Sequence, residues 1–409
     1  MLHTDEKTLY NAVILTINNN DDIIENGFIT IKSGKIIDIG YGKPNKKNLI
    51  DINGKIIIPG FINTHTHLAM TMFRGLADDL PLKEWLENNI WPAEKKHLNE
   101  DNIRKYVNIG LNEMISTGTT TFCDMYFFAD ITAEETQKVG LRAVMNEAVI
   151  DFPTNSYKTI DTAINKVLKF INKWRDNQLI TPAILFHSIY SCNKETLLRV
   201  KEIANKYNLI ISTHISETQD EVNLSIKQNN NTPAKYLHKL GLLTDKTLAS
   251  HCIWLTEDEQ NLLKKQKTNI THCPTSNLKL GSGIAPIHKY MKKGINISIG
   301  TDGCASNNNL NMIEEMRLTA LIHKGVNLDP TLITAKETLR MATINGAKAL
   351  GLEKQIGSIE IDKYADIVII DTQCTFMQPI YDYYSAIVYS MNNNCIDTVM
   401  VNGNILYER

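Results

Sequence analysis

Close to the N-terminus the chain reads Ile56-Ile57-Ile58-Pro59-Gly60-Phe61-Ile62-Asn63-Thr64-His65-Thr66-His67, a short apolar run that ends in two histidines. A run of this length beside turn residues is typical of a buried strand. Side chains two positions apart on a strand share a face, so His65 and His67 are near enough to bind one metal ion. The pair alone is a weak signal, because two polar residues leaving a core give the same pattern.

Seven more apolar runs follow, and a segment with helical periodicity comes after each of them. Repeated units of strand and helix are typical of a parallel sheet. Eight strands with interleaved helices predict an α/β fold, a (β/α)₈ TIM-like barrel. The predicted strands are residues 56–62, 119–123, 142–145, 183–186, 210–213, 248–250, 269–271 and 296–300.

The two ends of the chain differ from the middle. Residues 1–58 and 357–409 alternate apolar and polar positions in short runs, separated by turn pairs such as Asn26-Gly27 and Asn402-Gly403. This pattern is typical of hairpins in an antiparallel sheet. We expect both ends to form one small β-sandwich domain, and residues 59–356 to form the barrel domain that carries the chemistry.

The composition limits the classes of function. The 409 residues include 43 Lys and Arg against 45 Asp and Glu, a formal net charge of −2, which excludes a strongly basic nucleic-acid binder. Residues 1–7 do not resemble a secretory signal, and the apolar runs fall short of the roughly 20 residues that cross a bilayer. Seven scattered cysteines without a C-x-x-C pair predict free thiols in a reducing cytoplasm.

Polar residues stand where the predicted strands end. In such barrels the chemistry lies at the carboxyl ends of the strands. His214 and Asp302 at two of these ends would join His65 and His67 in a site of three nitrogens and one carboxylate, with water as a further ligand. Together they predict a metal site. The strand-end residues are His65, His67, His187, His214, His251, His272 and Asp302.

Three of the neighbouring residues allow two interpretations. Glu217, three positions after His214, is placed to move protons between water and substrate, or is a glutamate at the start of a helix. His251 is a group beside the nucleophile or a core histidine. His272 precedes Cys-Pro and is more simply explained as shaping a turn.

Six stretches of the chain are specific motifs: residues 59–67, 73–79, 91–94 (Trp-Pro-Ala-Glu), 214–217 (His-Ile-Ser-Glu), 276–280 (Ser-Asn-Leu-Lys-Leu) and 300–308 (Gly-Thr-Asp-Gly-Cys-Ala-Ser-Asn-Asn). They resemble the amidohydrolase superfamily, and within it they are most similar to the 5'-methylthioadenosine/S-adenosylhomocysteine deaminases. The resemblance runs nearly end to end. It implies hydrolytic deamination of the adenine 6-amino group of 5'-methylthioadenosine, and of S-adenosylhomocysteine or adenosine, to the inosine analogue and ammonia.

The resemblance also implies a cofactor and an assembly. One Zn²⁺, or another divalent ion, is expected on His65, His67, His214 and Asp302. Relatives with two metals usually have a lysine at the end of strand 4, and that strand here reads Ile184-Leu185-Phe186-His187-Ser188 without one. The family further implies a homo-oligomer, either a dimer or a tetramer.

The family assigns roles to the remaining site residues. Glu94 would hold the ribose hydroxyls, and His187 and Ser306 would contact the substrate. The alternative for Glu94 is one more surface acid beside Lys95. In the family's reaction Asp302 accepts a proton from the attacking water and Glu217 donates one to N1 of the ring. The same reaction uses His251 to stabilise the attacking oxygen.

One departure from the family bears on the substrate. The stretch after strand 3 lacks the arginine that some members offer to a substrate carboxylate, and it has Glu147 instead. An acid there would repel a carboxylate, so we expect methylthioadenosine or adenosine to be used better than S-adenosylhomocysteine, unless Arg74 replaces the arginine. Apolar residues after strand 1 are candidates for a methylthio pocket or for ordinary helix packing: Met70, Met72, Leu76, Trp85 and Trp91.

Two rival functions remain open from the sequence. A deaminase or dechlorinase of the same superfamily would act on guanine, a pterin or a triazine. Against this, Glu94 and His187 favour a nucleoside, since a free base has no ribose to hold. The other rival is a catalytically inactive barrel that serves as a scaffold, but a scaffold has no use for the full set of strand-end ligands.

Overall fold

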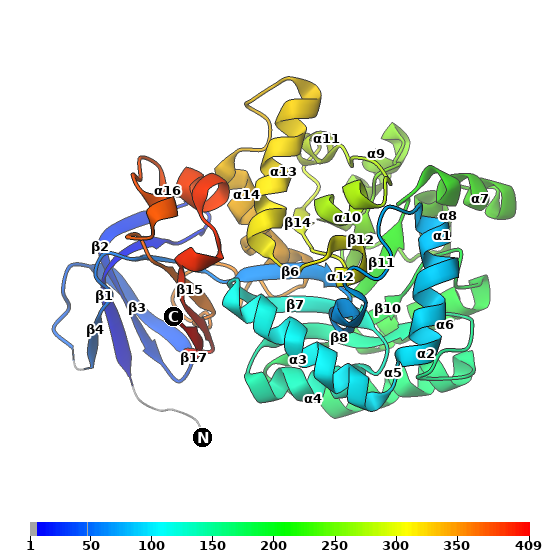
Figure 1. Cartoon of the computed structure of the whole chain (residues 1–409), viewed down its shortest axis with the longest axis horizontal. Helices are drawn as coiled ribbons and strands as arrows, with labels where there is room; N and C mark the ends of the chain where they lie inside the picture. The colour runs from blue at the N-terminus through cyan, green and yellow to red at the C-terminus, as the bar shows by residue number, and fades with distance from the viewer. Residues whose placement is uncertain (1–5, 47) are drawn as a thin grey trace.

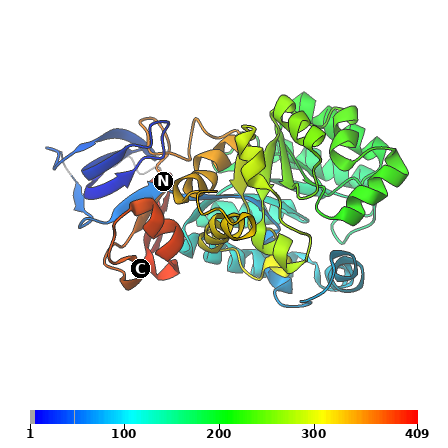
Figure 2. The ribbon, with the colours of Figure 1, turned by 90° about the horizontal axis from the view of Figure 1, so that it is seen from above.

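The computed structural model of the protein describes residues 6–46 and 48–409, which contain two sheets (Figure 1). One is a parallel sheet surrounded by helices, here called the barrel sheet. The other, here called the terminal sheet, takes strands from both ends of the chain. Figure 2 shows the strands of the terminal sheet, in blue and red, together on one side of the barrel.

The barrel sheet confirms the predicted fold class. Its strand order is β14-β13-β12-β11-β10-β8-β7-β6, and the short β9 pairs with β8. Every residue of β6, β7 and β8 is buried, as expected for parallel strands covered on both faces. The strands are β6 (Phe61–Thr66), β7 (Thr119–Tyr126), β8 (Arg142–Val149), β9 (Ile180–Pro182), β10 (Ile184–Phe186), β11 (Ile211–Ile215), β12 (Thr247–His251), β13 (Asn269–His272) and β14 (Ile297–Ile299).

Helices follow the strands, and side-chain caps fix where several of them begin. Asn193 accepts a hydrogen bond from the backbone N–H of Thr196 at the start of α6, and Thr256 forms a capping box with Glu259 at the start of α9. The helices of the barrel are α3 (Glu100–Ser116), α4 (Ala129–Val139), α5 (Ile160–Trp174), α6 (Lys194–Tyr207), α7 (Gln219–Asn229), α8 (Pro233–Leu240), α9 (Glu257–Gln266), α10 (Pro274–Lys279), α11 (Ile287–Lys292), α12 (Cys304–Asn307), α13 (Met312–Asn327), α14 (Ala335–Met341) and α15 (Ile344–Ala349).

A helical segment over residues 82–97 follows β6 before α3. It consists of α1 (Leu82–Glu84), a wider turn at Trp85–Ile90 and α2 (Trp91–His97). We call this segment the lid, because its apolar side chains cover the cavity described below. A short 3-10 turn at Leu68–Phe73 joins it to the barrel.

The barrel closes where β6 meets the end of β14. The hydroxyl of Thr64 lies 2.9 Å from that of Ser298, and the amide of Asn63 donates to the Thr301 hydroxyl at 2.8 Å. A Cβ added to Gly300 would lie 2.8 Å from the backbone nitrogen of His65. Glycine at this position therefore allows the first and last strands to approach closely enough for their ends to share a site.

The terminal sheet has the strand order β17-β16-β15-β5-β1-β2-β3, with β4 paired to β1. The predicted hairpins are antiparallel, and they pair β1 with β2, β2 with β3, and β16 with β17. In addition, β1 runs parallel to both β4 and β5. The short segment after β15 includes α16 (Tyr383–Ser385). The strands are β1 (Lys7–Leu15), β2 (Ile23–Lys32), β3 (Lys35–Tyr41), β4 (Leu49–Asp51), β5 (Ile56–Pro59), β15 (Ile367–Ile370), β16 (Ile396–Val401) and β17 (Asn404–Glu408).

The first predicted strand, residues 56–62, is two strands in the structure. Ile56–Pro59 forms β5 of the terminal sheet, and Phe61–Thr66 forms β6 of the barrel. They meet at Gly60, where an added Cβ would lie 2.1 Å from the Thr120 side chain. A continuous apolar run could not reveal this division, because both strands are fully buried.

All seven cysteines are buried and unpaired, in agreement with the prediction of free thiols. Within residues 6–46 and 48–409, none of the helices combines the length and the apolar composition that a membrane span requires.

A buried ion pair joins the two sheets at the end of the barrel where the strands begin, opposite their carboxyl ends. The guanidinium of Arg142, the first residue of β8, donates to both carboxylate oxygens of Asp366 at 2.8 and 3.3 Å. Both side chains are almost fully buried. The backbone N–H of Asn402 donates to the same carboxylate at 2.8 Å, so the Asp366 side chain holds groups from two other segments of the chain.

We expect Arg142→Ala to lower the free energy of unfolding by about 3–5 kcal/mol, because it leaves the Asp366 carboxylate buried without its partner. Urea denaturation followed by circular dichroism measures the loss. Arg199→Ala is the control, since Arg199 pairs at 2.8 Å with the largely exposed Asp161 and should shift the midpoint far less. Equal shifts for the two variants would contradict a special role for the buried pair.

Candidate active site

Four of the predicted strand-end residues form one compact group. His65 and His67 come from β6, His214 from β11 and Asp302 from the loop after β14. One ligand atom from each lies within 4.8 Å of the others. The Nε2 atoms of His65 and His214 are 3.1 Å apart, and Nε2 of His67 is 3.1 Å from Oδ1 of Asp302.

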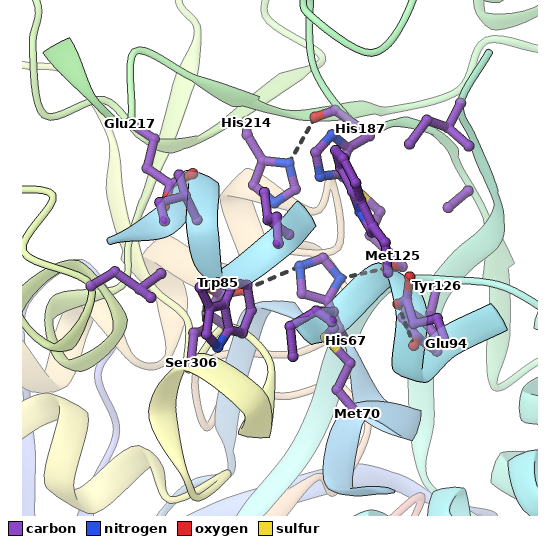
Figure 3. A pocket seen from close by; sticks show the side chains of 18 of the residues that line it. His67, Met70, Trp85, Glu94, Met125, Tyr126, His187, His214, Glu217 and Ser306 are labelled. Atoms are coloured by element: carbon purple, nitrogen blue, oxygen red, sulfur yellow. Dashed lines mark hydrogen bonds and ion pairs between the residues drawn. The ribbon is translucent and has the colours of Figure 1, made fainter. Parts of the chain in front are cut away.

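Backbone carbonyls orient two of the three imidazoles (Figure 3). Nδ1 of His67 donates to the Met125 carbonyl at 2.5 Å, and Nδ1 of His214 donates to the His187 carbonyl at 2.7 Å. A hydrogen bond at Nδ1 fixes the tautomer and leaves Nε2 free to bind a metal. Nδ1 of His65 has no hydrogen-bond partner among the described residues.

The charges of the group fit a divalent cation. Burial lowers the pKa of His65 to about 4 and holds that of His214 well below its usual range, so both rings are neutral near pH 7. Burial opposes ionisation of Asp302, but His65 and His67 outweigh it and hold its pKa well below the usual range. Burial opposes protonation of His67 as well, but Asp302 outweighs it and raises the pKa of this ring to about 9, so His67 has to lose a proton when a cation binds. Imidazole nitrogens and one carboxylate are the donor set of zinc and similar ions.

Asp302 is held in place from several sides. Its Oδ2 accepts hydrogen bonds from Ser276 at 2.6 Å and from Ser306 at 3.0 Å, and its Oδ1 accepts one from the Gly303 N–H at 2.8 Å. Its backbone lies in the left-handed region with φ of 59°. A residue other than glycine rarely adopts this conformation, and such strain is concentrated at functional sites.

Glu217 and His251 lie beside the four-residue group, and both line the same cavity. Nε2 of His251 is 3.8 Å from Oε2 of Glu217, and its Nδ1 donates to Oδ1 of Asn277 at 2.7 Å. The Glu217 backbone N–H donates to Glu221 at 2.7 Å. Burial raises the pKa of Glu217, which favours its protonated form.

Glu94 enters the cavity from α2 of the lid. It accepts a hydrogen bond from the Tyr126 hydroxyl at 2.6 Å, and burial raises its pKa to about 7. His187 also lines the cavity, and its Nδ1 is 2.9 Å from the Ser191 hydroxyl. Figure 3 shows Glu94 and Tyr126 on one side of His67, and Glu217 on the other. A ligand in the cavity therefore meets two different sets of polar groups.

The cavity is lined mainly by apolar and aromatic side chains, with a few polar groups among them, as is typical of a small-molecule site. Of the predicted apolar residues, Met70, Trp85 and Trp91 line it. Met72 and Leu76 are not among the lining residues, and Leu76 is half exposed. The lid contributes Leu82, Trp85, Leu86, Ile90, Trp91 and Glu94 to the cavity wall.

The structure corrects the interpretation of Glu147. Its carboxylate accepts hydrogen bonds from the backbone N–H groups of Phe128 at 3.2 Å and Ala129 at 3.0 Å, at the start of α4. It caps that helix and is not among the residues that line the cavity. The argument that Glu147 repels a substrate carboxylate is therefore wrong.

Arg74 is not placed to bind a substrate carboxylate either. Its guanidinium pairs with Glu113 of α3 and contacts the Cys304 thiol at 3.5 Å. Since Glu113 already satisfies its charge and Arg74 does not line the cavity, the second suggestion for a carboxylate anchor is also wrong.

His272 lies outside the four-residue group. Its ring is buried and faces His323 of α13, with ring centroids 5.6 Å apart. Thr271 points the other way, and its hydroxyl lies 3.0 Å from that of Thr64. The alternation of side chains along β13 therefore directs His272 toward the outer helices.

Several residues of the site were not predicted. Tyr126 and Met125 belong to β7, which was expected to end at Cys123 and runs three residues further. Ser276 and Asn277 belong to a motif that carried the family resemblance. Their hydrogen bonds, from Ser276 to Asp302 and from His251 to Asn277, were not predicted. These four residues position the predicted ones.

Comparison with known proteins identifies the family. Residues 56–406 match the amidohydrolase family. The chain belongs to the amidohydrolase family. A 5-methylthioadenosine/S-adenosylhomocysteine deaminase of Thermodesulfovibrio yellowstonii is 45% identical over 397 residues, covering 95% of this chain and 90% of that protein. A 5'-deoxyadenosine deaminase of Methanocaldococcus jannaschii is 43% identical, covering 92% of this chain and 90% of the relative.

A solved structure has the same fold. It is an adenosine deaminase from Xanthomonas campestris with bound zinc, 34% identical to this amidohydrolase, with a TM-score of 0.94. The match covers 97% of this chain and 92% of the other. Membership of the family agrees with the group of three histidines and one aspartate at the strand ends.

We expect the purified protein to retain about one divalent ion per chain, and His214→Ala to lose most of it, because three ligands bind far more weakly than four. Inductively coupled plasma mass spectrometry after dialysis gives the content. The control is His97→Ala, which removes an exposed histidine at the end of α2. Retention of the ion by the His214 variant would show that it is bound elsewhere.

Proposed function

We propose that this amidohydrolase is a zinc-dependent deaminase of adenine nucleosides, with 5'-methylthioadenosine as a substrate. The reaction adds water at C6 of the ring and releases ammonia and the inosine analogue. The observation that supports this most is the position of Glu217 and His251 beside the metal-binding group, with Glu94 in the same cavity. The names of the relatives point to the same chemistry.

Each residue of the site has a separate role in the proposed reaction. His65, His67, His214 and Asp302 would hold a divalent cation, which would supply a lowered pKa for water and so make hydroxide available near neutral pH. Asp302 accepts the proton that the attacking water loses. Glu217, whose burial favours the protonated form, donates a proton to N1, which makes C6 more electrophilic.

His251 orients the attacking water in this proposal. Asn277 accepts from its Nδ1, which leaves Nε2 as an acceptor for the O–H of that water. The proton that Asp302 has taken then passes to the amino group, the C6–N bond breaks and ammonia leaves. The C6 hydroxyl gives its proton back to Glu217, which leaves the carbonyl of the inosine analogue and restores the protein. Ser306 hydrogen-bonds Asp302 and lines the cavity, and we keep the prediction that it also contacts the substrate.

The other end of the substrate is assigned to Glu94 and His187. A carboxylate can accept hydrogen bonds from both hydroxyls of a ribose, and Tyr126 holds the Glu94 carboxyl in the cavity. His187 has its Nδ1 on Ser191, which leaves Nε2 for the nucleoside. This pair favours nucleosides over guanine, pterins and triazines, which lack the sugar.

We also propose how the chain divides into domains, where in the cell the protein acts and how it assembles. Residues 59–356 form the catalytic domain, since the assigned residues lie between His65 and Ser306, and residues 1–58 and 357–409 form a structural domain. The buried free thiols support a reducing cytoplasm. The family resemblance supports a homo-oligomer, a dimer or a tetramer.

The test of this function is ammonia release by the zinc-loaded protein with methylthioadenosine, 5'-deoxyadenosine, adenosine, adenine and guanine. We expect turnover of the nucleosides and little of the free bases. Glu217→Gln is the matched variant, because it keeps the shape of the side chain but cannot supply the proton. It should retain its metal and lose about 10²–10⁴-fold in kcat. Turnover of guanine alone would overturn the proposal, and an active Glu217 variant would overturn the role of this residue.

A further inference from the structure

Glu217 lies in the turn between β11 and α7, directly after a residue with an unusual backbone conformation. Ser216 has a φ of 51°, in the left-handed region that residues other than glycine rarely adopt. Such a conformation persists only where the surrounding structure holds it. The contacts that hold this turn therefore also decide where the Glu217 side chain points.

The loop after β12 holds one side of the turn. The backbone N–H groups of Ile253 and Trp254 donate to the Ser216 carbonyl at 3.1 and 3.0 Å. These two residues closely follow His251, whose Nε2 is 3.8 Å from the Glu217 carboxylate. The segments that carry Glu217 and His251 are thus joined to each other through their backbones.

A single carboxylate, that of Glu221, holds the other side of the turn. Its Oε1 accepts a hydrogen bond from the Ser216 N–H at 3.2 Å, and its Oε2 accepts one from the Glu217 N–H at 2.7 Å. Glu221 is the third residue of α7, and its side chain is buried. Burial raises the pKa of this carboxyl to about 7, and the backbone N–H groups oppose that rise because they stabilise the charged form.

The same sequence pattern behaves differently at other helices. Thr-x-x-Glu begins α7, α9 and α14. In α9 and α14 it forms a capping box, in which the glutamate accepts a hydrogen bond from the backbone N–H of the threonine. In α7 the Thr218 hydroxyl still accepts from the Glu221 N–H at 3.1 Å, but the carboxylate reaches beyond Thr218 to the two residues before it. The carboxylate therefore holds the end of β11 and the turn, where the other two hold the start of their own helix.

We propose that Glu221 is a positioning residue for deamination: it holds the N–H groups of Ser216 and Glu217, and so keeps the Glu217 carboxyl where it can protonate the ring. The proposal rests on the proposed function. Among the described residues that line the cavity, Glu217 is included and Glu221 is not, so Glu221 acts through Glu217. Its effect on the rate can still be large, because a reacting group displaced by about 1 Å can cost about 10²-fold.

The test is Glu221→Gln, with Glu259→Gln as the matched control. Glutamine keeps the size of the side chain but replaces one of the two acceptor oxygens with an NH₂ group. We expect kcat for methylthioadenosine to fall about 10–100-fold, with KM within about twofold of wild type and the metal content unchanged. Glu259 is buried at the third position of α9, where it closes the capping box, and it does not line the cavity. Its variant should lose stability but keep kcat within about twofold.

Two further variants test the route of the effect. If Glu221 acts through Glu217, adding Glu221→Gln to Glu217→Gln should lower kcat by less than about twofold, since substitutions that act through one group are not additive. A second loss as large as in the wild-type background would overturn the proposal. Glu221→Asp keeps the charge at the start of α7 but is one CH₂ too short to reach both N–H groups. It should show the same fall in kcat, and it decides the matter if the glutamine variant does not fold.

The outcomes separate this proposal from the proposed function. If the wild-type protein deaminates methylthioadenosine, but Glu221→Gln keeps its kcat, changes only KM or loses no more than Glu259→Gln, then Glu221 is a helix cap and the function stands. If the wild-type protein deaminates no nucleoside, the proposed function is wrong and this proposal is wrong with it. Circular dichroism at the assay temperature shows that the compared variants are folded.

Discussion

The approach of β6 to the end of β14 is the constraint on which the site depends. The backbone N–H of Asp302 donates to the His65 carbonyl at 3.0 Å, so the same contact that closes the barrel places the carboxylate against the histidines. Gly300 permits this approach, since a side chain there would strike His65. The left-handed backbone of Asp302 then turns its side chain toward the ligand group.

Burial gives the assembled groups their chemical character. It keeps His65 and His214 neutral and favours a protonated Glu217, whereas Asp302 remains ionised between two imidazoles. The four-residue group that can hold a cation, the proton donor Glu217 and the hydrogen-bond acceptor His251 therefore lie side by side, and each keeps the protonation state that its role requires. Carboxyl groups whose environments push their pKa values apart are typical of acid and base pairs in enzymes.

The sequence predicts the parts of the site that follow from strand geometry. His65, His67, His214 and Asp302 stand at strand ends, and the ends of parallel strands meet at one face of a barrel. Side-chain direction is harder to predict: neither Glu147, which caps α4, nor His272, which faces α13, could be placed without knowing which way its strand faces. A shift of one position reverses the face.

Residues from outside the strands depend on tertiary packing or on resemblance. Glu94 comes from the lid, and no periodicity in the chain connects it with the strand ends. Tyr126 was missed because the buried polar Asp124 interrupts the apolar run, although β7 continues through it.

We propose that deamination depends on a single ion held by the four-residue group. The measurement that tests this dependence is the rate of ammonia release from methylthioadenosine as zinc is returned to the chelator-treated protein. The rate should rise in proportion to added zinc and level off at about one equivalent per chain. Full activity without metal, or a break at about two equivalents, would contradict the account.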